Sequence, residues 1–324
     1  MPALITHRLF GEESITLLPE GLIASADDRS AFLIANQGPD PFFFRFRTLK
    51  IKDCMSLAHR MHASFITQQF MTLRDGVSRL PAHDAGTGRA FALGLLSHYI
   101  LDRTAHPFVY AQQWGIQEAD PEIAAAGNQI HAIIESDLDV LMLQRKRSGA
   151  TTENLPPASL LTSGDRVDKI GGVLMSYIAT KVYGLDVNAS QYGGAVADMN
   201  LIYRLIEPAG SPRSQTLAAL ERRVAGFSLL GGLAHRVTTK VPRRAGNLDE
   251  YLWENPFTHQ ASRESFPAVF DRALAAYQDA VQRFIEGGDL TDLTQRLDYS
   301  GCRLAPDEQA APSDEPTNER QVCS

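Results

Sequence analysis

The chain has 324 residues, of which 44% are hydrophobic and 21% charged, so it can bury a large core as one sizeable domain. Its formal net charge of −7 argues against a general nucleic-acid-binding protein, because such proteins carry an excess of basic side chains. The three cysteines are widely spaced and include no Cys-x-x-Cys pair, which indicates reduced thiols in a cytosolic protein.

The first segment, residues 1–18, lacks the features of a secretory signal. It has no basic region, no long apolar run and no small-residue cleavage site. Elsewhere no stretch approaches the roughly 20 apolar residues that a membrane span requires. We therefore expect a soluble, cytoplasmic protein, unless an unconventional route exports it.

The dominant hydrophobic period along the chain is helical, with apolar residues three and four positions apart. This period predicts helices over residues 54–73, 90–101, 123–143, 167–182, 195–206, 217–230 and 266–284. Strand-like alternation is scarce, and the short segment 42–47 (FFFRFR) is its best example. The sequence therefore predicts an all-α fold, with helices packed around a central site.

Potential metal ligands are concentrated in the segment 94–108 (GLLSHYILDRTAHPF), where His98, Asp102 and His106 are each four residues apart. On an α-helix this spacing places the three side chains close to one face. Two imidazoles and a carboxylate held in this way are suitable zinc ligands. Pro107 disfavours helical geometry for the residue before it, so we expect His106 to end the helix and to face a different ion.

Further candidate ligands lie on both sides of this segment. His131 and Glu135 are again four residues apart on a predicted helix. Asp40 lies among Gly38, Pro39 and Pro41, which favour a turn that presents its carboxylate inward. The remaining candidates lie near the N-terminus and on the helix before the cluster, and they are His7 and His62.

Two segments differ in composition from the predicted core. Residues 207–250 are rich in arginine and are interpreted as a solvated variable insertion, with a substrate- or membrane-facing lid as the alternative. Residues 301–324 are acidic and proline-rich, and we expect them to form a disordered tail after a helical domain spanning residues 1–300.

Taken together and in order, five segments resemble the zinc-dependent phospholipase C family, whose superfamily includes the single-strand-specific P1/S1 nucleases. They are THRLFG (6–11), NQGPDPFFF (36–44), RMH (60–62), GLLSHYILDRTAHPF (94–108) and HAIIES (131–136). The resemblance covers roughly residues 1–145 and extends more weakly through WENPF (253–257) and the helix after Ser265.

The resemblance implies an all-helical domain with two to three zinc ions per chain in a cleft. Its implied ligands are, for one ion, Asp40, His62, His98 and Asp102; for a second, His106, His131 and Glu135; and for a third, His7, a bridging Asp102 and, once Met1 is removed, the terminal amine and carbonyl of Pro2. This third site is where the chain departs from the pattern, because secreted relatives begin with tryptophan and this chain begins Met-Pro.

The implied activity is hydrolysis of a glycerophospholipid to diacylglycerol and a phosphorylated head group, with transient contact to a membrane surface. Asp40 is the first candidate for orienting or deprotonating the attacking water, and Glu135 is the second. Arg45 and Arg47 follow Asp40 closely enough to reach a phosphate oxygen, although arginines at such positions are more often surface or strand-end residues. Pro41 replaces the tyrosine of choline-selective relatives, so the sequence does not determine which phospholipid head group is preferred.

Two alternatives use the same fold: a P1/S1-like nuclease or nucleotidase, and a non-catalytic metal-binding protein. The net negative charge of the chain disfavours a stable nucleic-acid partner, and the complete set of candidate metal ligands disfavours a non-catalytic protein. Among the other histidines, we expect His59 and His83 to be satisfied core residues and His235 and His259 to lie at the surface.

Overall fold

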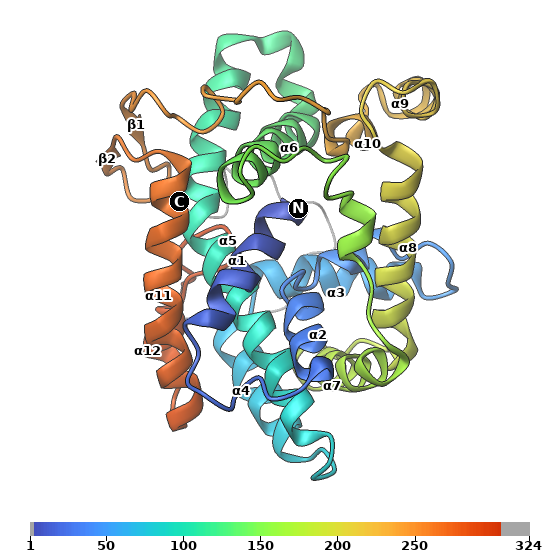
Figure 1. Cartoon of the computed structure of the whole chain (residues 1–324), viewed down its shortest axis with the longest axis vertical. Coiled ribbons are helices and arrows are strands. Elements are labelled where there is room, and N and C mark those ends of the chain that lie inside the picture. Colours follow the sequence, from blue (N-terminus) through green and yellow to red (C-terminus); the bar gives the residue numbers. More distant parts are fainter. Residues whose placement is uncertain (1–2, 306–324) are drawn as a thin grey trace.

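The computed structural model describes residues 3–305, and within them the protein is built almost entirely from helices (Figure 1). The α-helices are α1 (Leu4–Thr16), α2 (Ala26–Ala35), α3 (Ile51–Ala63), α4 (Ile66–Ser78), α5 (Ala85–Ala119), α6 (Gly127–Lys146), α7 (Asp165–Tyr183), α8 (Ser190–Ile206), α9 (Pro212–Ala225), α10 (Leu229–Leu233), α11 (Phe266–Glu286) and α12 (Thr291–Thr294). Three 3-10 helices are η1 (Asp40–Phe44), η2 (Pro121–Ala126) and η3 (Pro157–Leu160). The predicted all-α class is confirmed.

Helix α5 is the central element, and it runs along the middle of the molecule with α11 on one side and α2 and α4 beside it (Figure 1). Most of its side chains are buried, because residues 90–101 are apolar except for Ser97 and His98. Gly94 is required where α2 crosses, since a Cβ there would lie 2.2 Å from the Phe32 carbonyl oxygen. The long buried helix thus provides the rigid support on which the remaining elements pack.

Several element boundaries differ from those that the hydrophobic period predicts. The helix predicted over residues 54–73 is two helices, α3 and α4, separated at Phe65, whose φ of 55° no helix interior accepts. The helix predicted over 217–230 is likewise divided at Gly226. The strand-like segment 42–47 is not a strand, because Gly38 and two prolines start the 3-10 turn η1 instead.

The only sheet in the described residues joins β1 (Trp253–Glu254) to β2 (Ala261–Ser262) as a short antiparallel pair. Helices α9 and α10 lie within the segment 207–250 and contact α6 and α8.

Of the predicted tail, residues 306–324 lie outside the described residues. Cys302 is disulfide-bonded, so the expectation of three reduced thiols is wrong for this residue, whereas Cys54 is free and buried. No described helix is both long and apolar enough to cross a bilayer.

A buried carboxylate fixes the start of α2. Asp28 accepts hydrogen bonds from the backbone N–H groups of Ala24 and Ser25, and from the Thr87 hydroxyl of α5 at 2.8 Å. Burial alone would raise the pKa of Asp28, but these hydrogen bonds outweigh it and lower the pKa below 3.8. The carboxylate is therefore an anion at neutral pH and stabilises the positive end of the helix.

We predict that Asp28→Ala lowers the free energy of unfolding by about 1 to 2 kcal/mol at neutral pH, the scale of a lost helix cap. Since the folded pKa is lowered, the stabilisation is complete above the ordinary carboxyl pKa and is lost as the pH falls through the folded value. The difference between the two proteins should therefore shrink in acid. Urea unfolding tests this, with Asp27→Ala as control, and an equal loss in both variants would contradict it.

Candidate metal centre

Eight potential metal donors from five elements meet in the core. They are His7 on α1, Asp40 on η1, His62 on α3, His98, Asp102 and His106 on α5, and His131 and Glu135 on α6. All are buried except His62, whose side chain retains 16% exposure. The structure thus brings together every side chain predicted from the sequence as a ligand, while Pro2 lies outside the described residues.

The first donor group, consisting of His7, Asp40, His62, His98 and Asp102, is organised around the Asp102 carboxylate. One oxygen of Asp102 lies 3.0 Å from His7 Nε2, and the other lies 3.2 Å from His98 Nε2. Asp40 Oδ1 lies 3.0 Å from His62 Nε2. The two oxygens of Asp102 therefore face different imidazoles.

The second donor group consists of His106, His131 and Glu135. Glu135 Oε1 lies 3.6 Å from His106 Nε2 and 3.3 Å from His131 Nε2. The three side chains come from the facing surfaces of α5 and α6. This group coincides with the set that the sequence resemblance implied for one ion.

The helix does not end at His106, contrary to our expectation, because α5 continues through Pro107 to Ala119. His106 nevertheless belongs to a different donor group from His98. Each four-residue step turns a side chain by about 40°, so His106 lies roughly 80° around the helix from His98. Helical geometry alone therefore divides the donors of α5 between the two groups.

Unsatisfied polar atoms test whether a cation fits this site. The Nε2 atoms of His62, His98 and His131 are buried and make no hydrogen bond, although each lies 3.0 to 3.3 Å from a carboxylate oxygen. Asp40 Oδ1 and Glu135 Oε2 are likewise buried without a hydrogen-bond partner. Buried polar atoms are normally hydrogen-bonded. Converging lone pairs of nitrogen and oxygen suit zinc, and eight donors exceed what one tetrahedral ion uses.

The opposite ring nitrogens of four histidines are held by acceptors. Nδ1 of His62 lies 2.7 Å from the Ala58 carbonyl oxygen, and Nδ1 of His98 lies 3.2 Å from that of Asn36. In the second group, His106 Nδ1 lies 2.7 Å from the Tyr299 carbonyl oxygen, and His131 Nδ1 lies 2.8 Å from Gln113 Oε1. Each acceptor holds the proton on Nδ1 and leaves Nε2 facing the site, as in metal-binding histidines.

The electrostatics of the site favour anionic carboxylates. Burial would raise the pKa values of Asp40 and Asp102, but the imidazoles around them, His98 foremost, outweigh it and lower both. Glu135 behaves in the same way beside His131. Burial lowers the pKa of His98, which favours the neutral imidazole. Burial would also lower the pKa of His106, but Asp102 and Glu135 raise it to about 9.

The turn that carries Asp40 is fixed from outside by α8. Gly38 has a φ of +58°, and a Cβ there would lie 2.2 Å from the His98 ring, so only glycine fits. Asp198 accepts hydrogen bonds from the Arg45 guanidinium at 2.6 Å, from that of Arg47, and from the backbone N–H of Arg47 at 3.1 Å. Arg45 and Arg47 are therefore bound to Asp198, which restrains the end of the turn.

Sequence reasoning missed several residues that support the site. Tyr299 donates its N–H to the His62 carbonyl oxygen at 3.0 Å, accepts from His106 through its own carbonyl, and packs its ring 4.8 Å from that of His62. A backbone carbonyl leaves no signal in a sequence. The expectations for three other histidines are wrong: His59 and His83 are exposed, and His235 is buried in an ion-pair network.

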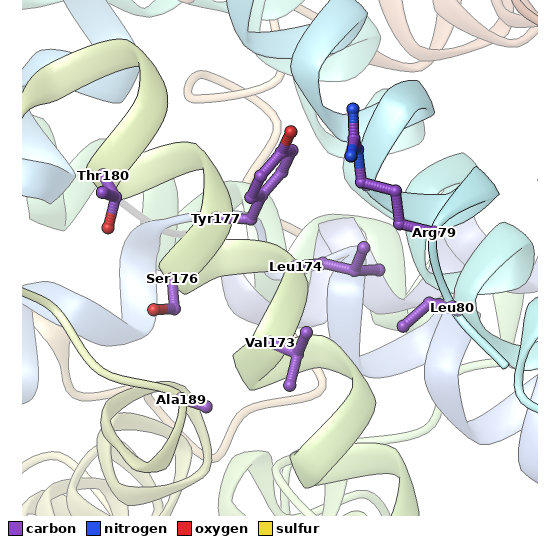
Figure 2. Close-up of a pocket in the computed structure, with 9 residues that line it drawn as sticks. Arg79, Leu80, Val173, Leu174, Ser176, Tyr177, Thr180 and Ala189 are labelled. Carbon is purple, nitrogen blue, oxygen red and sulfur yellow. The ribbon is translucent and has the colours of Figure 1, made fainter.

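A pocket of about 310 Å³ lies elsewhere, between α7 and the end of α4 (Figure 2). Figure 2 shows Val173, Leu174 and Tyr177 of α7 facing Arg79 and Leu80 across it. None of its lining residues belongs to either donor group. This pocket therefore contributes nothing to the candidate metal chemistry.

Comparison with known proteins gives one match. Residues 6–181 match the family model described as zinc dependent phospholipase C, and this segment contains all eight donors. No curated protein and no solved structure is significantly similar to the chain.

We predict that Gln113→Leu weakens zinc binding at the second donor group by about tenfold or more, because it removes the acceptor that holds His131 Nδ1. Gln112→Leu is the matched control, since the neighbouring Gln112 donates its side-chain N–H to the Ala245 carbonyl oxygen and not to a ligand histidine. Titration against a competing chelator measures both. Equal zinc affinity in the two variants would remove Gln113 from the site.

Proposed function

The chain belongs to the zinc-dependent phospholipase C family, and from this membership we propose that it hydrolyses the phosphodiester of a glycerophospholipid. The products would be diacylglycerol and a phosphorylated head group. The observation that supports the proposal most is the convergence of buried donor atoms that have no hydrogen-bond partner. Such atoms cost free energy unless a cation occupies the space between them.

We propose two to three zinc ions per chain. Asp40, His62, His98 and Asp102 would hold one ion, and the second donor group would hold another. The third would use His7 and Asp102 and, if Met1 is removed, the amine and carbonyl of Pro2. Bound zinc would supply positive charge for the anionic phosphodiester and would make water more acidic.

The chain's own residues contribute positioning and proton transfer. Asp40 is buried, and its lowered pKa keeps it anionic, so it is suited to accept a hydrogen bond from the attacking water and orient it, and it is our first candidate to receive the proton of that water. Glu135 is the second candidate for this role, for the same reasons. Both side chains are fixed by buried elements, which reduces the rearrangement required during the reaction.

Asp40→Asn should reduce phosphodiester hydrolysis by about a hundredfold or more, the usual scale for loss of a general base. The amide retains the shape of the carboxylate, so the fold should persist. The assay uses mixed micelles of several phospholipids, together with nucleotides and single-stranded DNA. Wild-type turnover by the Asn variant would exclude Asp40 from the mechanism, and cleavage of nucleotides alone would favour the nuclease alternative.

Asp102→Ala should remove more than one zinc ion per chain, because the two oxygens of Asp102 face different histidines. Metal analysis by mass spectrometry, after zinc loading and removal of excess metal, measures the loss. His131→Ala is the control, since it removes a donor from the second group only. Loss of a single ion from the Asp102 variant would contradict a bridging role.

A further inference from the structure

The N-terminal end of α1 is capped by a side chain from another helix. Asp139 of α6 accepts hydrogen bonds from the backbone N–H of Ile5 at 2.8 Å and from that of Thr6 at 2.7 Å. Helix α1 has no capping side chain of its own, and its first turn contains no acidic residue. Since the first N–H groups of a helix lack intrahelical partners, Asp139 both satisfies them and fixes where the helix begins.

Asp139 is itself held in a buried chain of ionisable groups. His235 donates from Nε2 to Asp139 at 3.0 Å and from Nδ1 to Glu207 at 2.5 Å. Asp139 and His235 are 0% and 1% exposed. Burial would lower the pKa of His235, but hydrogen bonds to the two carboxylates raise it to about 9. The imidazolium between two carboxylates fixes the side chain of Asp139.

His7 is the donor that depends most on the placement of its helix. It follows Thr6 directly, within the turn that Asp139 caps. The other four histidine donors have an acceptor on Nδ1, whereas Nδ1 of His7 is buried and has none. Apart from its stacking on His98 at 4.2 Å and its contact with Asp102, the orientation of His7 is set by the backbone of α1.

We propose that Asp139, His235 and Glu207 form a positioning device for His7, and that they thereby control zinc binding on the His7 side of the first donor group. The inference rests on the proposed zinc cluster. Glu207 and His235 lie outside the segment 6–181 that matches the family. Residues beyond the matched segment would therefore determine whether one of its donors is in place.

The test compares zinc content and affinity in the full-length protein, using zinc alone as the probe. Asp139→Asn keeps the size of the side chain but replaces one acceptor oxygen by a donor that faces a backbone N–H. We expect a loss of about one zinc per chain, with affinity for that ion lowered about tenfold or more, and retention of the zinc held by the second donor group. Glu207→Gln, farther from His7, should produce a smaller change in the same direction.

Asp28→Asn is the matched control, because Asp28 is also a buried carboxylate that accepts two backbone N–H groups at the start of a helix. It should lower stability without changing zinc content. In a His7→Ala background, Asp139→Asn should cause no further loss of zinc, since both changes act on the same ion.

Three outcomes would overturn the proposal: full zinc content and affinity in Asp139→Asn, additive losses in the double variant, or loss of zinc from both donor groups equally. The last would assign Asp139 to general stability. If the wild-type protein itself binds no zinc, the proposed function fails. If the wild type binds its full complement and Asp139→Asn does so too, only the positioning role fails.

Discussion

Three carboxylates of the centre, those of Asp40, Asp102 and Glu135, lie in the core of the protein, and the rest of the structure is arranged around this constraint. Burying an uncompensated carboxylate costs several kcal/mol. Five imidazoles face these groups and lower their pKa values. An imidazole that stays neutral, such as His98 with its lowered pKa, compensates only partly, and converging lone pairs repel one another. The proposed set of divalent cations would remove both costs.

Helices and one 3-10 turn fix the relative positions of the donor side chains. Helix α5 supplies one donor to each successive turn between His98 and His106, and its roughly 40° rotation per step distributes them between two groups. The backbone positions of α1, η1 and α3 bring the other donors of the first group to this helix. Partners such as the carbonyl oxygens of Asn36 and Tyr299 then fix individual rings. The geometry of the centre thus belongs to the fold and not to one flexible loop.

The all-α class could be predicted from the helical hydrophobic period, and the family from the resemblance of its ordered motifs. Within these motifs, the four-residue spacing of His98 and Asp102, and of His131 and Glu135, follows from helical geometry. The prediction that the helix ends at His106 is wrong, because Pro107 does not interrupt α5. The prediction that His235 lies at the surface is also wrong. The burial of His235 depends on Asp139 and Glu207, which are distant in sequence, and no local pattern encodes such a contact.

Zinc-edge anomalous diffraction from crystals of the zinc-loaded protein would test the central claim most directly. We expect anomalous peaks within coordination distance of the donors in both groups, with Asp102 close to two of them. Peaks confined to surface histidines such as His83 and His259, with none in the core, would contradict it.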